Sequence, residues 1–167
     1  MGREIERKFL VRDPSVVAHV PGTPIRQGYL STDPDRTVRV RRAGERAYIT
    51  IKGRARGPSR AEYEYEVPAE DAAELLDALC LRPILEKTRY RILHAGRTWE
   101  VDVFGADNAG LVTAEIELPD EDVEVEIPDW VGPEVTGDGR FVNANLVARP
   151  WIAWPADERD ATGQPGA

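Results

Sequence analysis

The sequence has very little of the chemistry that most redox and transition-metal sites use. Cys80 is its single cysteine, so the chain can form no internal disulfide and offers no cysteine cluster for zinc. The two histidines, His19 and His94, lack the spacing of metal ligands on one element. We therefore expect neither a histidine-based triad nor a zinc enzyme. The scarcity of cysteine fits a reducing, cytoplasmic setting.

Long apolar runs are missing too. No stretch approaches the ~20 residues that a membrane-spanning helix needs, and charge begins at Arg3, so we expect no signal peptide. The formal net charge of -8 argues against a general surface for nucleic acid or for an anionic membrane. We expect neither partner. An anionic ligand would therefore need a local basic site or bridging cations.

What the sequence has in excess is charge. Asp, Glu, Lys and Arg make up 31% of it, against about 25% in a typical protein. At 167 residues the chain is long enough for one compact domain with a real core. We expect this domain to span residues 1–155 and the polar tail, residues 156–167, to be disordered.

Alternating patterns that are broken by turn residues predict eight strands. These strands are expected over residues 3–12, 25–31, 36–42, 46–52, 60–67, 84–93, 97–104 and 112–118. The clearest helix is predicted over residues 69–81, where the apolar side chains fall on one stripe. A shorter helix is predicted over 140–147 and a short strand over 124–127.

Seven of the eight predicted strands carry charge on one face and apolar residues on the other. Because successive side chains point to opposite faces of a strand, Glu4, Glu6 and Lys8 share a face in the first one. For a single strand, the ordinary explanation is a sheet whose polar face meets solvent. The joint pattern argues otherwise, because these faces are nearly pure Glu/Asp or Arg/Lys and each tends toward one sign.

Eight antiparallel strands can close into a barrel. We predict an α+β, mainly β fold in which an eight-stranded antiparallel closed barrel has a charged lumen and a few helices cover its outside. Guanidinium groups match phosphate oxygens, and clustered carboxylates match a hard divalent cation such as Mg²⁺ or Mn²⁺. A polyphosphate with its metal would satisfy both sets of charges at once.

The ordered set of motifs resembles the CYTH superfamily, the triphosphate tunnel metalloenzymes, and above all its small bacterial members. The resemblance covers nearly the whole chain. It begins with Glu4-x-Glu6-x-Lys8 and continues through residues 26–30, 38–41, 50–52, 62–64, 86–90, 100–104, 115–117, 134–136 and 143–146. It implies an eight-stranded tunnel that binds triphosphate together with a divalent metal.

The resemblance also implies roles for individual residues. The family's metal-binding carboxylates match Glu4, Glu6, Glu115 and Glu117. Asp102 is a further candidate, either as a ligand or as a residue that supports the ligands from behind. Its triphosphate-binding cations match Lys8, Arg39, Arg41, Lys52, Lys87 and Arg89. Lys87 also matches a lysine that is a candidate for activating the attacking water. Glu62 and Glu64 are candidates for orienting the cations, binding a second metal or positioning the water.

The function that the sequence predicts is metal-dependent hydrolysis of inorganic triphosphate inside the tunnel. Adenylate cyclase and thiamine triphosphatase activities are the enzymatic alternatives, because relatives with this fold have them. A module that binds polyphosphate or nucleotide without catalysis is the alternative of another class. An apolar barrel exterior and several tryptophans also point to a homodimer.

Overall fold

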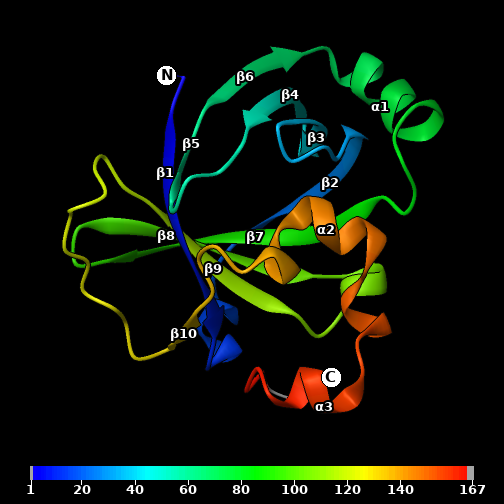
Figure 1. Cartoon of the computed structure of the whole chain (residues 1–167). Coiled ribbons are helices and arrows are strands. Elements are labelled where there is room, and N and C mark those ends of the chain that lie inside the picture. The colour runs from blue at the N-terminus through cyan, green and yellow to red at the C-terminus, as the bar shows by residue number, and fades with distance from the viewer. Residues whose placement is uncertain (1, 165–167) are drawn as a thin grey trace.

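The computed structural model describes residues 2–164 (Figure 1). Within these residues, ten strands form one antiparallel sheet. The strands are β1 (Glu4–Val11), β2 (Gly22–Ser31), β3 (Arg36–Ala43), β4 (Arg46–Gly53), β5 (Ser59–Arg60), β6 (Glu62–Val67), β7 (Leu85–His94), β8 (Arg97–Phe104), β9 (Val112–Glu117) and β10 (Val131–Glu134). The α-helices are α1 (Ala69–Ala78), α2 (Asn143–Ala148) and α3 (Ala156–Asp160). Short 3-10 helices are η1 (Pro14–Val17), η2 (Ala106–Asn108), η3 (Gly139–Phe141) and η4 (Trp151–Ala153).

The mainly β, antiparallel fold is confirmed, and all eight predicted strands are present. The strand predicted over residues 60–67 is divided at Ala61 into β5 and β6. The short strand predicted over 124–127 is absent, and β10 forms instead over 131–134. Strand β10 contains Gly132 and Pro133, which a sheet tolerates here because β10 lies at its edge. The helix predicted over 140–147 is divided into η3 and α2.

The sheet curves around a central space without forming a complete ring. Its hydrogen-bonded order is β10-β1-β9-β8-β7-β2-β3-β4-β6, and β5 pairs with β1 off this path. The two ends meet near the start of β1, where Ile5 pairs with Ser59 and the Glu62 amide donates to the Gly2 carbonyl at 3.3 Å. The predicted closed barrel is therefore an open path whose ends are bridged by β5.

The apolar outer face of the sheet has two covers. Ala72 and Leu76 of α1 pack against Val40 and Ala47 on the outside of β3 and β4. On the opposite side of the molecule, Phe9, Trp99 and their neighbours on β1, β8 and β9 pack beneath the segment around residues 123–131. The predicted outward direction of the apolar rows is thus confirmed, and helix α1 serves as the predicted cover.

The inward-facing rows of the strands turn apolar at one end of the central space. Leu10 follows Lys8 on the inner face of β1, and Phe104 follows Asp102 on the inner face of β8. These inner-face residues pack against the C-terminal segment to form an apolar plug. The apolar plug consists of Leu10, Leu85, Phe104, Leu111, Phe141, Leu146, Trp151 and Trp154, all of them buried. The predicted tunnel is therefore filled at one end.

The polar tail differs from the disorder that its composition predicts. Residues 156–160 form α3, and Glu158 pairs with both Arg140 and Arg149. The Gln164 side chain accepts a hydrogen bond from the Val112 amide at 2.9 Å. These long-range contacts cannot be read from composition, and residues 165–167 of the predicted tail lie outside the described residues.

No helix among residues 2–164 is long and apolar enough to cross a membrane.

Candidate active site

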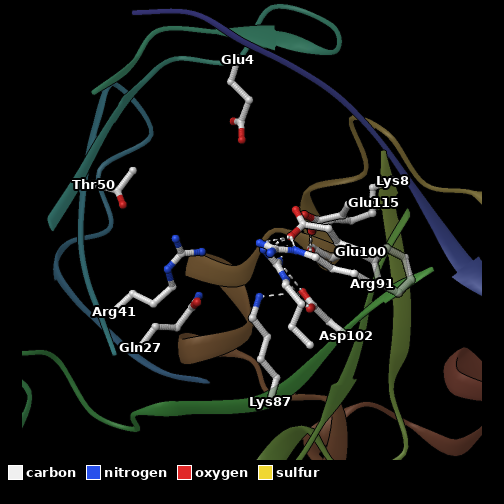
Figure 2. A network of polar contacts seen from close by, with 12 residues as sticks. Glu4, Lys8, Gln27, Arg41, Thr50, Lys87, Arg91, Glu100, Asp102 and Glu115 are labelled. Carbon is white, nitrogen blue, oxygen red and sulfur yellow. Dashed lines mark hydrogen bonds and ion pairs between the residues drawn. The ribbon is translucent and has the colours of Figure 1, made fainter. Parts of the chain in front are cut away.

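A cavity of about 340 Å³ lies inside the curved sheet, and most of its walls are charged. The strands place these side chains inward because charged and apolar residues alternate along them. The charged residues of the lining are Glu4, Glu6, Lys8, Arg39, Arg41, Lys52, Arg60, Glu62, Glu64, Arg89, Arg91, Glu100, Glu115, Glu117 and Asp138. Figure 2 shows several of them directed from opposite strands toward the same central space.

The two arginines of β3 form one basic wall of the cavity. Arg39 and Arg41 alternate with Val38 and Val40, which places both guanidinium groups on the inner face. Each lies close to the Glu64 carboxylate, at 3.5 Å for Arg39 and 3.3 Å for Arg41. Burial and the positive charge of Arg39 lower the pKa of Arg41. Positive charge is therefore crowded here, which is the environment that an anion stabilises.

Two lysines of the lining, Lys52 on β4 and Lys8 on β1, hold carboxylates. The ammonium of Lys52 lies 2.9 Å from Glu4 and 2.9 Å from Glu62. Burial raises the pKa of Glu4, but Lys52 and Arg60 outweigh it and bring that pKa down to about 2. On β1, Lys8 pairs with Glu115 of the neighbouring β9 at 3.0 Å and also donates to the Phe141 carbonyl at 3.2 Å.

Two further carboxylates have no such partner. Glu6 on β1 and Glu117 on β9 are direct cross-strand neighbours, and no residue in the described part of the chain forms an ion pair with either. Burial, together with the charges of Glu115 and Glu4, raises the pKa of Glu6 well above its usual range. Burial and the nearby Glu4 and Glu62 carboxylates also raise the pKa of Glu117.

This pair of carboxylates fits a divalent cation. Like charges directly opposite each other destabilise a sheet unless a counter-charge lies between them. As the side chains stand, no three acidic, histidine or cysteine residues among the described ones are arranged around one metal position. Glu6 and Glu117 would hold the ion, and Glu4 or Glu115 would join them on release from its lysine partner. Carboxylate oxygens are the ligands that Mg²⁺ and Mn²⁺ prefer.

A buried ion cluster lies just beyond the cavity wall, next to the apolar plug. Asp102 is fully buried, and its carboxylate accepts hydrogen bonds from Lys87 at 2.7 Å and from the Arg89 guanidinium at 2.8 Å. Burial lowers the pKa of Lys87 to about 8, although the Asp102 charge opposes the shift. Arg89 also reaches the cavity, where it lies 3.2 Å from Glu100 and 3.6 Å from Glu115.

The structure thus brings most of the predicted site residues together around one cavity, with two exceptions. Lys87 and Asp102 do not line it, and both oxygens of Asp102 are engaged by the two neighbouring cations. The carboxylate of Asp102 is directed at Lys87 and Arg89, and its role as a metal ligand stays a prediction.

Two inner-face residues without charge, Thr50 and Gln27, were missed as candidates. Thr50 accepts a hydrogen bond from Arg39 at 3.1 Å and donates one to Glu64 at 2.7 Å. Gln27 is fully buried on β2 and donates to the Tyr29 hydroxyl at 3.0 Å. Candidates were chosen from strands with a charged face, and β2 has none. The two-residue period of a strand does place Gln27 and Tyr29 on the same face of β2.

Comparisons with known proteins agree with this geometry. The CYTH domain model matches residues 2–141. An inorganic triphosphatase of Acetivibrio thermocellus is 50% identical over 151 residues, which cover 90% of this chain and 97% of that protein. An inorganic triphosphatase of Nitrosomonas europaea is 39% identical over 148 residues, which cover 86% of this chain and 95% of that protein. A crystal structure of an inorganic triphosphatase superimposes with a TM-score of 0.61 at 34% identity and covers 91% of this chain and 96% of that one. The chain belongs to the CYTH domain family.

Proposed function

We propose that this protein hydrolyses inorganic triphosphate with the help of a divalent metal ion. The observation that carries the proposal is the cavity itself, in which the side chains of five cations converge from different strands beside a pair of unneutralised carboxylates. The cations are Lys8, Arg39, Arg41, Lys52 and Arg89. The name inorganic triphosphatase, borne by relatives that are 50% and 39% identical, supports the same substrate.

The cations would bind the phosphate chain. Arg39 and Arg41 each use part of the guanidinium on Glu64, and their Nε–H groups are buried with no hydrogen-bond partner in the described structure. Phosphate oxygens would satisfy these donors in the forked geometry that guanidinium groups favour. Lys52 on β4, next to the arginines, and Lys8 on β1 would contribute point charges. Glu62 and Glu64 would hold Lys52 and the two arginines in place.

Glu6 and Glu117, together with Glu4 or Glu115, would hold Mg²⁺ or Mn²⁺. The bound ion would neutralise phosphate charge as the terminal phosphoryl group is transferred. This arrangement also explains why the carboxylates lie within reach of the lysines: the cations compensate for the acids before substrate and metal arrive.

Lys87 is the candidate for activating the attacking water. Its lowered pKa, about 8, would let a neutral amine accept a proton near physiological pH. Asp102 would act through its neighbours, because it fixes both Lys87 and Arg89 from the buried side. We therefore assign Asp102 a positioning role in place of the ligand role suggested by the family resemblance.

A phosphate-release assay tests the proposal. The protein would be supplied with Mg²⁺ or Mn²⁺ and, in parallel, with tripolyphosphate, ATP and thiamine triphosphate. We expect tripolyphosphate to be the preferred substrate and phosphate and pyrophosphate to be the products. Cyclic AMP as the main product from ATP would indicate a cyclase, and tight tripolyphosphate binding without turnover under any condition would indicate a binding module. The cytoplasmic location and the homodimer remain predictions, the latter testable by sedimentation.

A further inference from the structure

We propose that the Gln27 side-chain carbonyl orients the water molecule that attacks the terminal phosphate. The inference rests on the proposed triphosphatase function and adds to it a catalytic residue that carries no charge. Gln27 sits on β2, at the boundary between the charged cavity and the apolar plug. The residue has three features that lead to this role: its position, its unpaired oxygen and the cations around it.

The register of the sheet places Gln27 beside the proposed reacting groups. It lies directly opposite Arg41 on β3 and opposite Leu85, a plug residue, on β7. Lys87 is two residues along from Leu85 on the same face, so it is a diagonal neighbour of Gln27. Figure 2 shows the amide of Gln27, the guanidinium of Arg41 and the ammonium of Lys87 directed into one region of the central space.

The amide of Gln27 is only half satisfied. Its nitrogen donates to the Tyr29 hydroxyl at 3.0 Å, whereas its oxygen is buried and has no hydrogen-bond partner in the described part of the chain. Buried polar atoms are rarely left unpaired. The hydrogen bond to Tyr29 occupies the amide nitrogen and leaves the oxygen free, and the nearest cations in the sheet register are Arg41, directly opposite, and Lys87, diagonally opposite.

The chemistry of the missing partner identifies it. An amide oxygen needs a hydrogen-bond donor, and the oxygens of a triphosphate are acceptors. The buried Nε–H groups of Arg39 and Arg41 need acceptors, which the phosphate supplies. A water molecule supplies the donor that Gln27 requires. The site therefore separates its two reactants, with the terminal phosphate against the arginines and the water against the carbonyl of Gln27.

In the reaction, the water oxygen forms a bond to the terminal phosphorus. The bond between that phosphorus and the bridging oxygen breaks, and its electron pair leaves with pyrophosphate. The hydrogen held by Gln27 stays on the new orthophosphate, and the other proton of the water ends on the pyrophosphate. Gln27 accepts a hydrogen bond throughout and exchanges no proton, so its contribution is the alignment of the water.

Steady-state kinetics on the full chain with tripolyphosphate test the inference. Gln27→Met keeps the size of the side chain and removes the acceptor, and Gln27→Asn keeps the amide but withdraws it by one methylene. We expect both variants to lower kcat by about 100-fold, with KM changed by less than about 3-fold. The matched control is Thr113→Val, which removes another unpaired buried oxygen from the inner face. Neither Gln27 nor Thr113 lines the cavity, but Thr113 lies opposite Leu10 on β1 and so on the far side of the sheet order from Arg41. Thr113→Val should leave both constants near the wild-type values.

Four results would overturn the inference. Wild-type kcat in Gln27→Met would show that the carbonyl is not needed. A rise in KM at constant kcat would make Gln27 a substrate-binding residue. A similar loss of kcat and of melting temperature in both Gln27→Met and Thr113→Val would show that these buried inner-face residues contribute only to folding. A wild-type protein that releases no phosphate from tripolyphosphate would instead refute the proposed function, and this inference with it.

Discussion

Glu6 and Glu117 are direct cross-strand neighbours on β1 and β9, and no described residue pairs with either carboxylate. Two residues along the same ladder, Lys8 and Glu115 are also direct neighbours, and they form an ion pair at 3.0 Å. One ladder therefore contains a neutralised pair next to a repulsive one. The repulsive pair marks where the folded protein gains from a bound cation.

Removing one charge from this pair should stabilise the metal-free protein. We expect Glu6→Gln to raise the melting temperature in chelator by about 2–4 °C, the change that about 1 kcal/mol produces in a domain of this size. The same variant should lose the stabilisation that Mg²⁺ or Mn²⁺ gives the wild type. Thermal melts with and without metal measure both effects. Glu74→Gln on the exposed surface of α1 is the control, and a lower melting temperature for Glu6→Gln would contradict the prediction.

The stability of the metal-free protein should also depend on pH in a particular direction. The pKa of Glu6 in the folded chain lies well above the ordinary value of 4.5, so above that pH the folded state binds more protons than the unfolded state. Stability should therefore fall as pH rises from 4.5 through the raised pKa. Glu4, whose pKa is about 2, has the opposite effect: its contribution to stability rises between pH 2 and 4.5 and stays constant above that range. Glu6→Gln should flatten the slope, and an unchanged slope would refute the assignment.

Arg39 should contribute to substrate binding far more than to folding. We expect Arg39→Ala to raise KM for tripolyphosphate by about 10- to 100-fold, because a charge-assisted contact to phosphate is worth about 1.5–3 kcal/mol. The far-ultraviolet circular dichroism should not change. Arg46→Ala is the matched control, since Arg46 is exposed and pairs with Glu66 away from the cavity. If Arg39→Ala and Arg46→Ala had the same KM and kcat, Arg39 would not be a substrate-binding residue.

Asp102 should be needed for both folding and turnover. We expect Asp102→Ala to lower the free energy of unfolding by about 3–5 kcal/mol, because it leaves Lys87 and Arg89 as buried charges without their partner. Urea denaturation measures the loss, and kcat should fall as well because both cations lose their anchor. Glu66→Ala, which removes an exposed ion pair, should change stability little. Full stability in Asp102→Ala would show that the cluster tolerates rearrangement.

The charged interior could be predicted from the sequence because the alternation of charged and apolar residues repeats along seven of the eight predicted strands. Glu4, Glu6 and Lys8 already show the alternation, and the neighbouring strands follow the same rule. The position of Asp102 was harder to predict, since alternation gives its face but not its depth. Its place beside the apolar plug depends on contacts with residues some 40 positions later, such as Phe141 and Trp151.

Other features depend on single contacts that have no local signature. The last helix is fixed by the pairing of Glu158 with Arg140 and Arg149, although the composition of that segment favours disorder. Gln27 shows the same limit at the site. One uncharged residue in a strand carries no signal by itself, and only the unpaired oxygen in the folded chain draws attention to it.

The apolar plug sets the order in which material can leave the cavity. Because Leu10, Phe104 and their partners fill the inner end, neither substrate nor product can pass through that end. In the arrangement that we propose, the orthophosphate would form beside Gln27, next to the plug, and the pyrophosphate would lie farther from the plug. Pyrophosphate would then leave the cavity first. Its release would limit the release of orthophosphate and the start of the next turnover.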